Sequence, residues 1–273
     1  MITPYYDKDG ITIYHGDCRE ILPQLDKVDL VLTSPPYDDL REYEGFDWDF
    51  PTASNLINGV MVDGGVLVWV VADATHNGSE TGTSFKQALA FKSMGLNLHD
   101  TMIYYRNSPP LTHRRYEQFF EYMFVFVKGT LKTFNPIMVP KLWQDKRKHK
   151  MFRRNDDDSM DYGYCSSKEN RIRSNVWSYN VGGGHTTKDK IAHQHPAIFP
   201  DQLAKDHVMS WSNAGDTILD PFMGSGTTLV AAKLLGRKAI GIEIEEKYCK
   251  IAVERLRQQV MNFGAIEGLK NGE

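Results

Sequence analysis

The sequence predicts an α/β fold in which a largely parallel sheet is covered by helices on both faces. Apolar segments of strand length alternate with segments of helical periodicity at both ends of the chain, which is the rhythm of βαβ units. Residues 65–71 form an uninterrupted apolar run, as expected for a strand that is buried on both faces. Turns that contain glycine or proline follow several of these strands, and such sheets bind ligands beyond the carboxyl ends of their strands.

The first 130 residues hold the first group of predicted elements. Helix formers from 19 to 25 carry apolar residues at helical spacing between two short strands, and Gly95 ends a second helical pattern. Lys128-Gly129 is a turn signal after the last strand of this group. Strands are predicted at 11–14, 28–32, 65–71, 100–105 and 122–127, and helices at 19–25 and 84–94.

A second group of elements follows a long interruption. From 131 to 194 the periodicity gives way to polar, basic and glycine-containing sequence, which predicts an insertion that is partly irregular and partly mobile. Helices are then predicted at 202–210, 227–235 and 247–260, and strands at 217–220 and 238–243, before a frayed tail. We therefore expect one domain formed by residues 1–130 and 195–273, with 131–194 inserted between the two halves.

The composition limits the class of protein. The 273 residues are 41% hydrophobic and 25% charged, which excludes a disordered, collagen-like or coiled-coil chain. No apolar run approaches the roughly 20 residues that a membrane span needs. Cys18, Cys165 and Cys249 form no C-x-x-C pair, so we expect a reducing cytoplasm. The histidines between 185 and 195 lack carboxylate or cysteine companions at ligand spacing, and no metal site is predicted.

A glycine turn joins the strand 217–220 to the helix after it. In Asp220-Pro-Phe-Met-Gly-Ser-Gly-Thr-Thr228, the glycines and the free amides of the helix start offer a close seat for a ligand. Leu229 stands where the dinucleotide fingerprint needs glycine, and the phosphate loop is absent. Glu243 ends the next strand, near the spacing at which an acid binds ribose hydroxyls. With Asp17 at the tip of another strand, the pattern favours a nucleoside without phosphate over a tight turn alone.

A rigid turn follows the strand 28–32. Ser34-Pro35-Pro36-Tyr37 contains two consecutive prolines, which fix their backbone angles and donate no hydrogen bond to a sheet. The Ser34 hydroxyl and the Pro35 carbonyl can both accept from one amino group, and Tyr37 offers a ring for a flat base. The alternative is a proline pair that only ends the strand.

Together these motifs resemble the amino-DNA methyltransferases that use S-adenosylmethionine. The resemblance rests on residues 33–37 as the catalytic motif, 220–228 as the methionine-binding motif, 241–252 as the acid and helix of the cofactor site, and 195–200 as the segment that packs beside the cofactor. This order, with the catalytic motif first, is that of the β class. It implies a single Rossmann-like methyltransferase domain with circularly permuted motif order and an inserted target-recognition region.

The resemblance also implies a mechanism. The target base is flipped out of double-stranded DNA, and its exocyclic amino nitrogen attacks the sulfonium methyl group in line. Ser34 and the Pro35 carbonyl would accept hydrogen bonds from the amino group while Tyr37 stacks the base. Asp17 would bind the adenine amino group of the cofactor, and Glu243 its ribose. The implied catalytic residues are Ser34, Pro35, Pro36 and Tyr37; the implied cofactor residues are Asp17, Asp220, Phe222, Gly224, Ser225, Gly226, Thr227 and Glu243.

A basic stretch suits a DNA substrate. The whole chain has a net charge of −3, yet between residues 102 and 154 twelve Lys and Arg stand against three Asp and Glu. Cations at this density match the phosphates of DNA, although a charge run in isolation is usually a solvated surface. The residues expected to bind DNA are Lys146, Arg147, Lys148, Arg153 and Arg154.

The base that is methylated is open between two alternatives. Ser-Pro-Pro-Tyr resembles the form common in cytosine-N4 enzymes, whereas Asp-Pro-Pro-Tyr is commoner in adenine-N6 enzymes, so a site-specific cytosine-N4 enzyme is preferred. No cysteine follows a proline, which disfavours cytosine-C5 chemistry. The other hypotheses are a DNA-binding module with a degenerate cofactor pocket and a methyltransferase for RNA or a protein amide. The recognition sequence, a homodimer and a companion restriction endonuclease stay open.

Overall fold

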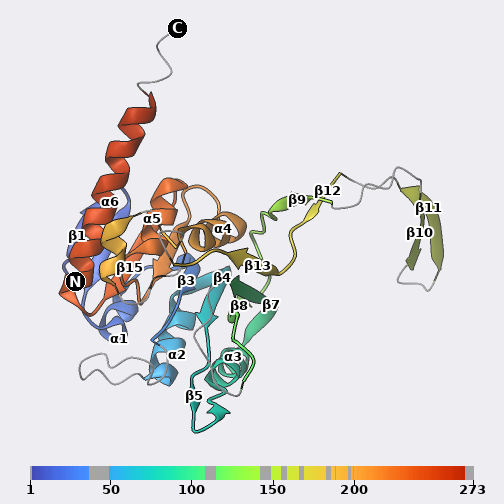
Figure 1. Ribbon diagram of the computed structural model, residues 1–273, viewed down its shortest axis with the longest axis horizontal. Coiled ribbons are helices and arrows are strands. Elements are labelled where there is room, and N and C mark those ends of the chain that lie inside the picture. Colours follow the sequence, from blue (N-terminus) through green and yellow to red (C-terminus); the bar gives the residue numbers. More distant parts are fainter. Residues whose placement is uncertain are drawn as a thin grey trace. The chain divides into compact units, whose positions relative to one another are not determined.

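Two compact units make up the protein. One consists of Met1–Asn135 and Asn175–Glu273 and is called here the sheet unit; the other is Pro136–Ser174 and is called the insertion unit. Figure 1 draws the chain as a ribbon. The computed structural model describes residues 2–36, 49–107, 115–141, 149–154, 159–165, 169–182, 186–187, 189–195, 198 and 200–267.

The sheet unit is built around a sheet of nine described strands. In spatial order they are β1 (Tyr6–Lys8), β2 (Ile11–His15), β15 (Lys238–Glu243), β14 (Thr217–Asp220), β3 (Val28–Thr33), β4 (Met61–Val71), β8 (Phe120–Lys128), β7 (Leu96–Arg106) and β13 (Val176–Tyr179). The five strands from β2 to β4 are parallel. Their carboxyl ends therefore lie along one edge, called here the carboxyl edge.

β14 joins the two ends of the chain. It pairs in parallel with β3, placing Ile218 opposite Leu30, and with β15 on its other side. The two halves of the chain therefore share one sheet and one core, which confirms the predicted single α/β domain. The sheet is mixed rather than wholly parallel, because β8 runs antiparallel to both β4 and β7.

Helices cover both faces of the sheet. They are α1 (Cys18–Ile21), the 3-10 helix η1 (Leu22–Gln24), α2 (Phe50–Val60), α3 (Thr83–Ser93), the 3-10 helix η2 (Lys190–Gln194), α4 (Asp201–Trp211), α5 (Thr227–Leu234) and α6 (Glu246–Glu267). A small hairpin of β5 (Thr75–His76) and β6 (Ser79–Glu80) precedes α3. Figure 1 shows α4, α5 and α6 together on one side of the sheet and α1, α2 and α3 on the other. Within the described residues, no helix combines the length and the apolar character needed to cross a bilayer.

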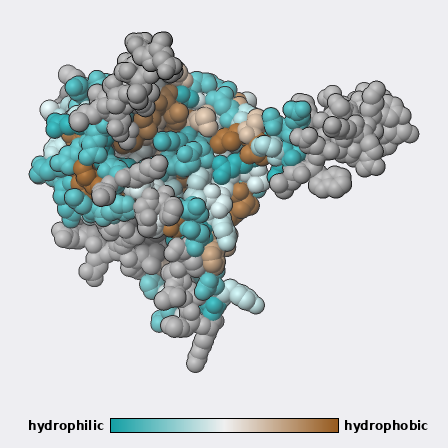
Figure 2. Space-filling model, turned by 45° about the horizontal axis from the view of Figure 1, so that its top comes forward, coloured by the Kyte–Doolittle hydropathy of each residue, from teal (hydrophilic) through white to brown (hydrophobic). Residues whose placement is uncertain are grey.

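The core lies between the sheet and these helices. Trp69 of β4 is fully buried, its ring lies 5.0 Å from that of Phe91 in α3, and its Nε1 donates to Gln87 Oε1 at 2.8 Å. On the face shown in Figure 2, hydrophobic residues are scattered among hydrophilic ones. The burial of apolar side chains such as Trp69 and Phe91 is the main stabilising contribution to a fold. Here it stabilises the strands that end at the carboxyl edge.

The insertion unit is shorter than the predicted insertion 131–194. Its described residues form two antiparallel pairs, β9 (Met138–Pro140) with β12 (Asn170–Ile172) and β10 (His149–Arg154) with β11 (Met160–Cys165). Residues 175–194 belong instead to the sheet unit. The physical reason is that β13 adds to the sheet beside β7, and that Asp189 forms an ion pair with Arg255 of α6.

Candidate active site

Predicted functional residues gather at the carboxyl edge. Ser34 directly follows β3, Asp220 ends β14 and Glu243 ends β15. Asp17 lies two residues after β2, and the intervening Gly16 donates its backbone N–H to Glu243 O at 2.9 Å. The fold therefore brings the predicted catalytic turn and the predicted cofactor residues to the same edge of one sheet.

Asp220 joins the glycine turn to β3. Its buried Oδ1 accepts a hydrogen bond from Thr33 Oγ1 at 2.7 Å and another from Phe222 N at 3.2 Å. Burial raises the pKa of Asp220 to about 6 although these bonds oppose the shift. Phe222 packs edge-on against Trp69 at a centroid distance of 6.4 Å. Both side chains thus position the turn.

Gly224 and Gly226 cannot be replaced without strain. Their φ angles are +51° and +78°, a region that other residues rarely adopt. A Cβ atom on Gly224 would lie 2.8 Å from His195 Nε2, and one on Gly226 would lie 2.8 Å from Ala252 Cβ. The His195 ring also meets Tyr248 of α6 edge-on at 4.2 Å. The segment that the resemblance places beside the cofactor thus contacts the glycine turn through His195; Pro196, Ala197 and Phe199 lie outside the described residues.

The Glu243 carboxylate binds the backbone of the turn. Its Oε2 accepts from Gly224 N and its Oε1 from Glu245 N, each at 2.9 Å. The side chain is almost wholly buried, and this desolvation raises the pKa of Glu243 to about 7. An ionised carboxylate has about four acceptor positions, so its backbone partners leave room for a hydroxyl of a ribose. A ribose hydroxyl of S-adenosylmethionine is a donor that this carboxylate can accept from.

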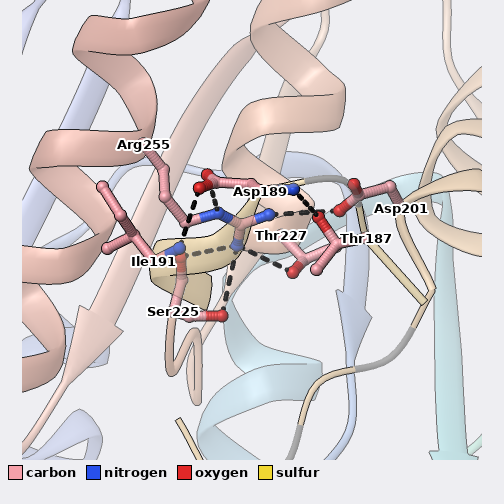
Figure 3. A network of polar contacts seen from close by, with 7 residues as sticks. All are labelled: Thr187, Asp189, Ile191, Asp201, Ser225, Thr227 and Arg255. Atoms are coloured by element: carbon pink, nitrogen blue, oxygen red, sulfur yellow. Dashed lines mark hydrogen bonds and ion pairs between the residues drawn. The ribbon is translucent and has the colours of Figure 1, made fainter. Parts of the chain in front are cut away.

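The Ser225 and Thr227 side chains are hydrogen-bonded to Arg255 of α6. Arg255 Nη1 donates to Ser225 O at 2.8 Å, to Ser225 Oγ at 3.1 Å and to Thr227 Oγ1 at 3.0 Å, as Figure 3 shows. Both hydroxyls are buried in this network. The backbone of the turn is therefore the part that can face the methionine end of a cofactor. Arg255 was not among the predicted residues.

Asp17 has a second partner that the motif did not reveal. Its carboxylate caps α1 by accepting from Arg19 N at 2.8 Å, and it binds the Arg19 side chain from Nε at 2.9 Å and from Nη2 at 2.6 Å. The side-chain hydrogen bonds from Arg19 lower the pKa of Asp17. The spacing Asp-x-Arg before a helix is the sequence signal that could have found this pair. Binding of an adenine amino group by Asp17 would share the carboxylate with Arg19.

The predicted catalytic turn follows β3 at the carboxyl edge. Ser34 and Pro36 are half-buried and Pro35 is buried. Thr33, the last residue of β3, donates to Asp220, and Thr228 Oγ1 donates to Leu32 O at 3.3 Å. The strand that leads into the proline turn is therefore hydrogen-bonded to both ends of the glycine turn. Tyr37 lies outside the described residues.

The residues predicted to bind DNA fall in the insertion unit. Arg153 and Arg154 lie in β10, whereas Lys146, Arg147 and Lys148 lie outside the described residues. For metals, no group of three or more His, Cys, Asp or Glu that could hold an ion occurs within the described ranges.

This fold and this edge define a methyltransferase that uses S-adenosylmethionine. The sequence model of the N6/N4 methyltransferase family, described as DNA methylase, matches residues 28–254. The chain belongs to this family of DNA methylases. The predicted fold class, family and cofactor are thereby confirmed.

Known proteins support the assignment. The chain is 48% identical over 258 residues to the orphan methyltransferase M.BamHII of Bacillus amyloliquefaciens, with 93% of this chain and 94% of the relative covered. It is 25% identical to the M1.HpyAVI–S-adenosylmethionine complex, with 90% of this chain and 98% of that chain covered and a TM-score of 0.61. The cytosine-N4-specific PvuII DNA methyltransferase shares the fold, with 17% identity, 92% and 88% coverage and a TM-score of 0.68.

Proposed function

We propose that the enzyme methylates the N4 amino group of cytosine at a specific sequence in double-stranded DNA. The observation that carries this proposal is the serine at the head of the Ser34-Pro35-Pro36 turn, at the carboxyl edge and directly after β3. Serine in this place resembles the form common in cytosine-N4 enzymes. The family includes both N6 and N4 methyltransferases, so the identity of the base rests on this turn.

The turn would act by positioning the amino group. S-adenosylmethionine supplies an electrophilic methyl group when it is bound. The Ser34 hydroxyl and the Pro35 carbonyl accept hydrogen bonds from the two amino hydrogens, which turns the nitrogen lone pair toward the methyl group and supports the positive charge that develops on nitrogen. The proton that leaves the nitrogen passes to water, because neither a serine hydroxyl nor a carbonyl is a base at neutral pH. Tyr37 stacks the flipped base.

The chain's own residues hold the cofactor around this turn. Glu243 accepts from the ribose hydroxyls, the backbone from Gly224 to Thr227 binds the methionine end, and Asp17 accepts from the adenine amino group. Two of the acceptor positions on the Glu243 carboxylate are already used by backbone amides. These bonds fix the orientation of the carboxylate that accepts from the ribose. The insertion unit binds DNA through its basic residues and reads the target sequence. A homodimer and a companion restriction endonuclease stay predictions.

The experiment that tests the base is nucleoside analysis. The enzyme is incubated with methyl-labelled S-adenosylmethionine and unmethylated genomic DNA, and the digested nucleosides are analysed by mass spectrometry. We expect N4-methylcytosine. N6-methyladenine in its place would overturn the interpretation of Ser34 while leaving the family assignment intact. A Ser34→Ala variant should lose about 100-fold in rate, as expected for a misplaced reactant, and should still bind S-adenosylmethionine.

The remaining hypotheses give different outcomes of the same experiment. If cofactor binding is measurable but no nucleoside is labelled, competition between duplex DNA, structured RNA and protein substrates identifies the acceptor. If S-adenosylmethionine does not bind at all, the chain is a DNA-binding module with a degenerate pocket.

A further inference from the structure

One buried arginine joins four segments behind the candidate cofactor seat. Arg255 lies in α6, and 1% of its side chain is exposed. Its guanidinium forms ion pairs with two carboxylates, from Nε to Asp189 Oδ2 at 3.0 Å and from Nη2 to Asp201 Oδ1 at 3.1 Å. Its Nη1 binds Ser225 and Thr227 of the glycine turn. Figure 3 shows all of these partners around the one guanidinium.

The two carboxylates close a loop that carries His195. The described residues of this segment, 186–187, 189–195, 198 and 200–201, are called here the histidine loop. Asp189 and Asp201 lie six residues to either side of His195. The base of the loop is closed by Asp201 N, which donates to Thr186 O at 3.1 Å. Asp189 Oδ1 also accepts from Ile191 N at 3.1 Å and so caps η2. Arg255 therefore binds the loop near both of its ends.

The loop approaches the glycine turn closely at His195. His195 lies where a Cβ atom on Gly224 would be only 2.8 Å from its Nε2. On the loop side, Arg255 holds the carboxylates that flank His195; on the other side it holds the residues that flank Gly226. The same guanidinium thus fixes both the histidine loop and the glycine turn, which together form this part of the seat.

Arginine is suited to this position in a way that lysine is not. Its planar fork presents five N–H donors in fixed directions, and here they meet acceptors on four residues. An ammonium group is a point charge that cannot match this geometry. Removal of the cation would leave the partly buried Asp189 carboxylate without its ion-pair partner and would remove a contact that joins the loop to the turn.

We propose that Arg255 is a positioning residue for S-adenosylmethionine, which holds the histidine loop against the glycine turn so that the cofactor seat is formed before the cofactor arrives. This inference rests on the proposed seat at Gly224 and Glu243. It does not depend on which base is methylated. Preorganisation of this kind lowers the ordering cost of binding and improves affinity without a contact to the ligand.

The test compares Arg255→Lys with a matched control in the full chain. Arg237 is also partly buried and binds Ser212 through Nε at 3.2 Å and Nη2 at 2.8 Å, but it precedes β15 at the opposite end of that strand from Glu243. Calorimetry measures the dissociation constant for S-adenosylmethionine, and thermal unfolding without cofactor measures stability. We expect Arg255→Lys to weaken cofactor binding by about tenfold or more, because a seat that is no longer preorganised must be ordered when the cofactor binds. Arg237→Lys should lower stability and leave cofactor affinity unchanged.

Hydrogen exchange separates positioning from general stability. In Arg255→Lys the amides of the histidine loop should exchange faster than those of β3 and β4, and saturating S-adenosylmethionine should restore their protection. The KM for the cofactor should rise while kcat at saturation changes little. Asp201→Asn, which removes one half-exposed partner, should show the same pattern more weakly.

Three results would overturn the proposal. The first is an Arg255→Lys variant that unfolds more easily yet binds the cofactor as tightly as the natural protein. The second is an Arg237→Lys control that loses cofactor affinity in proportion to its stability. The third is an Arg255→Lys variant whose loop amides exchange no faster. A Gly224→Ala variant tests the proposed cofactor seat separately. If this variant binds S-adenosylmethionine with unchanged affinity, the seat at Gly224 is wrong, whatever the role of Arg255.

Discussion

At the scale of single residues, the carboxyl edge depends on carboxylates buried against backbone amides. Glu243 binds Gly224 N and Glu245 N, and its pKa is raised to about 7 by burial. A raised pKa means that the folded protein favours the protonated acid. The stability that this contributes is complete below the ordinary value of 4.5 and is lost as the pH rises through about 7.

Cofactor binding should have the opposite dependence on pH. Ribose hydroxyls donate to an ionised carboxylate, so we expect the affinity for S-adenosylmethionine to rise as the pH increases through about 7, the pKa of Glu243 in the free protein. Calorimetry in two buffers of different ionisation enthalpy should show that binding releases a proton below that pH.

A glutamine variant is the control for this pH dependence. Glu243→Gln should bind the cofactor weakly at every pH and should lose most of the slope; what is left would come from neighbours such as Asp220, whose pKa is raised to about 6 by burial. An affinity that stays flat through about pH 7 in the natural protein would contradict the role of Glu243.

Residues in contiguous motifs could be predicted, and their buried partners could not. The spacing of the motifs placed Asp17, Ser34 and Glu243 at the ends of strands, and the structure brings them to one edge. Arg19 and Arg255 were missed, because a charged residue on a helix normally indicates a solvated face. Only the fold shows that Arg255 is enclosed by carboxylates from 66 and 54 residues away in the chain.

At the scale of elements, a polar contact inside an apolar core helps to fix helix α3 to the sheet. Trp69 Nε1 donates to Gln87 Oε1 at 2.8 Å, and both side chains are buried. Phe50 and Phe91 pack edge-on around the same indole. The contact sets which turn of α3 faces β4.

Loss of the amide should destabilise the protein without affecting the site. Gln87→Leu leaves the indole N–H unpaired in the core, so we expect the free energy of unfolding in urea to fall by about 1–3 kcal/mol. Cofactor affinity should stay unchanged. The double variant Trp69→Phe with Gln87→Leu removes both polar groups and should be less unstable than the sum of the single changes. A fully stable Gln87→Leu variant would refute this account of the contact.

Strong periodicity located most elements, and short or capped ones were missed. β14 and β15 have the predicted bounds, because their apolar runs end at clear turn signals. Helix α2 was not predicted, although Asp49 caps it by accepting from Thr52 N and a proline occupies its first turn. β13 has four residues and is recognisable only through its partner β7. The predicted helix 19–25 is a short α1 followed by η1, where a proline stands in the first turn.

At the scale of the whole molecule, the insertion unit leaves and re-enters the sheet unit at two fixed points. Asn135 donates from its backbone N to Ser210 O at 2.8 Å. Asn175 accepts on its carbonyl oxygen from Ile103 N, also at 2.8 Å. The sheet unit therefore anchors both ends of the excursion with its own contacts.

Removal of the insertion unit should affect the binding of DNA and not the binding of S-adenosylmethionine. When 136–174 is replaced by a short glycine–serine linker, we expect S-adenosylmethionine binding to persist and DNA binding to be lost together with its salt dependence. Calorimetry and fluorescence anisotropy at several salt concentrations measure the two affinities. In the full chain, conversion of Lys146, Arg147 and Lys148 to glutamine should flatten the salt dependence only in part. Loss of cofactor binding on deletion would show that the sheet unit needs the insertion in order to fold.

The order of the strands in the sheet could not be predicted from the sequence. Each strand's apolar pattern predicts burial, but the pattern is the same for a parallel and for an antiparallel neighbour. β7 and β8 therefore could not be distinguished from members of a parallel sheet. The motif order did indicate that the two ends of the chain meet, and β14 between β3 and β15 is the strand at which they do.

The place of β14 has a consequence for how the enzyme is made. While the chain leaves the ribosome, β3 and β4 can pair early, but the free side of β3 waits for a strand encoded almost 190 residues later. Until then an apolar strand edge is open to aggregation, and chaperones are the natural protection. The catalytic turn and the glycine turn meet only when that late strand is in place. A chain that ends before β14 therefore lacks the hydrogen bond between Thr33 and Asp220 that ties β3 to the glycine turn.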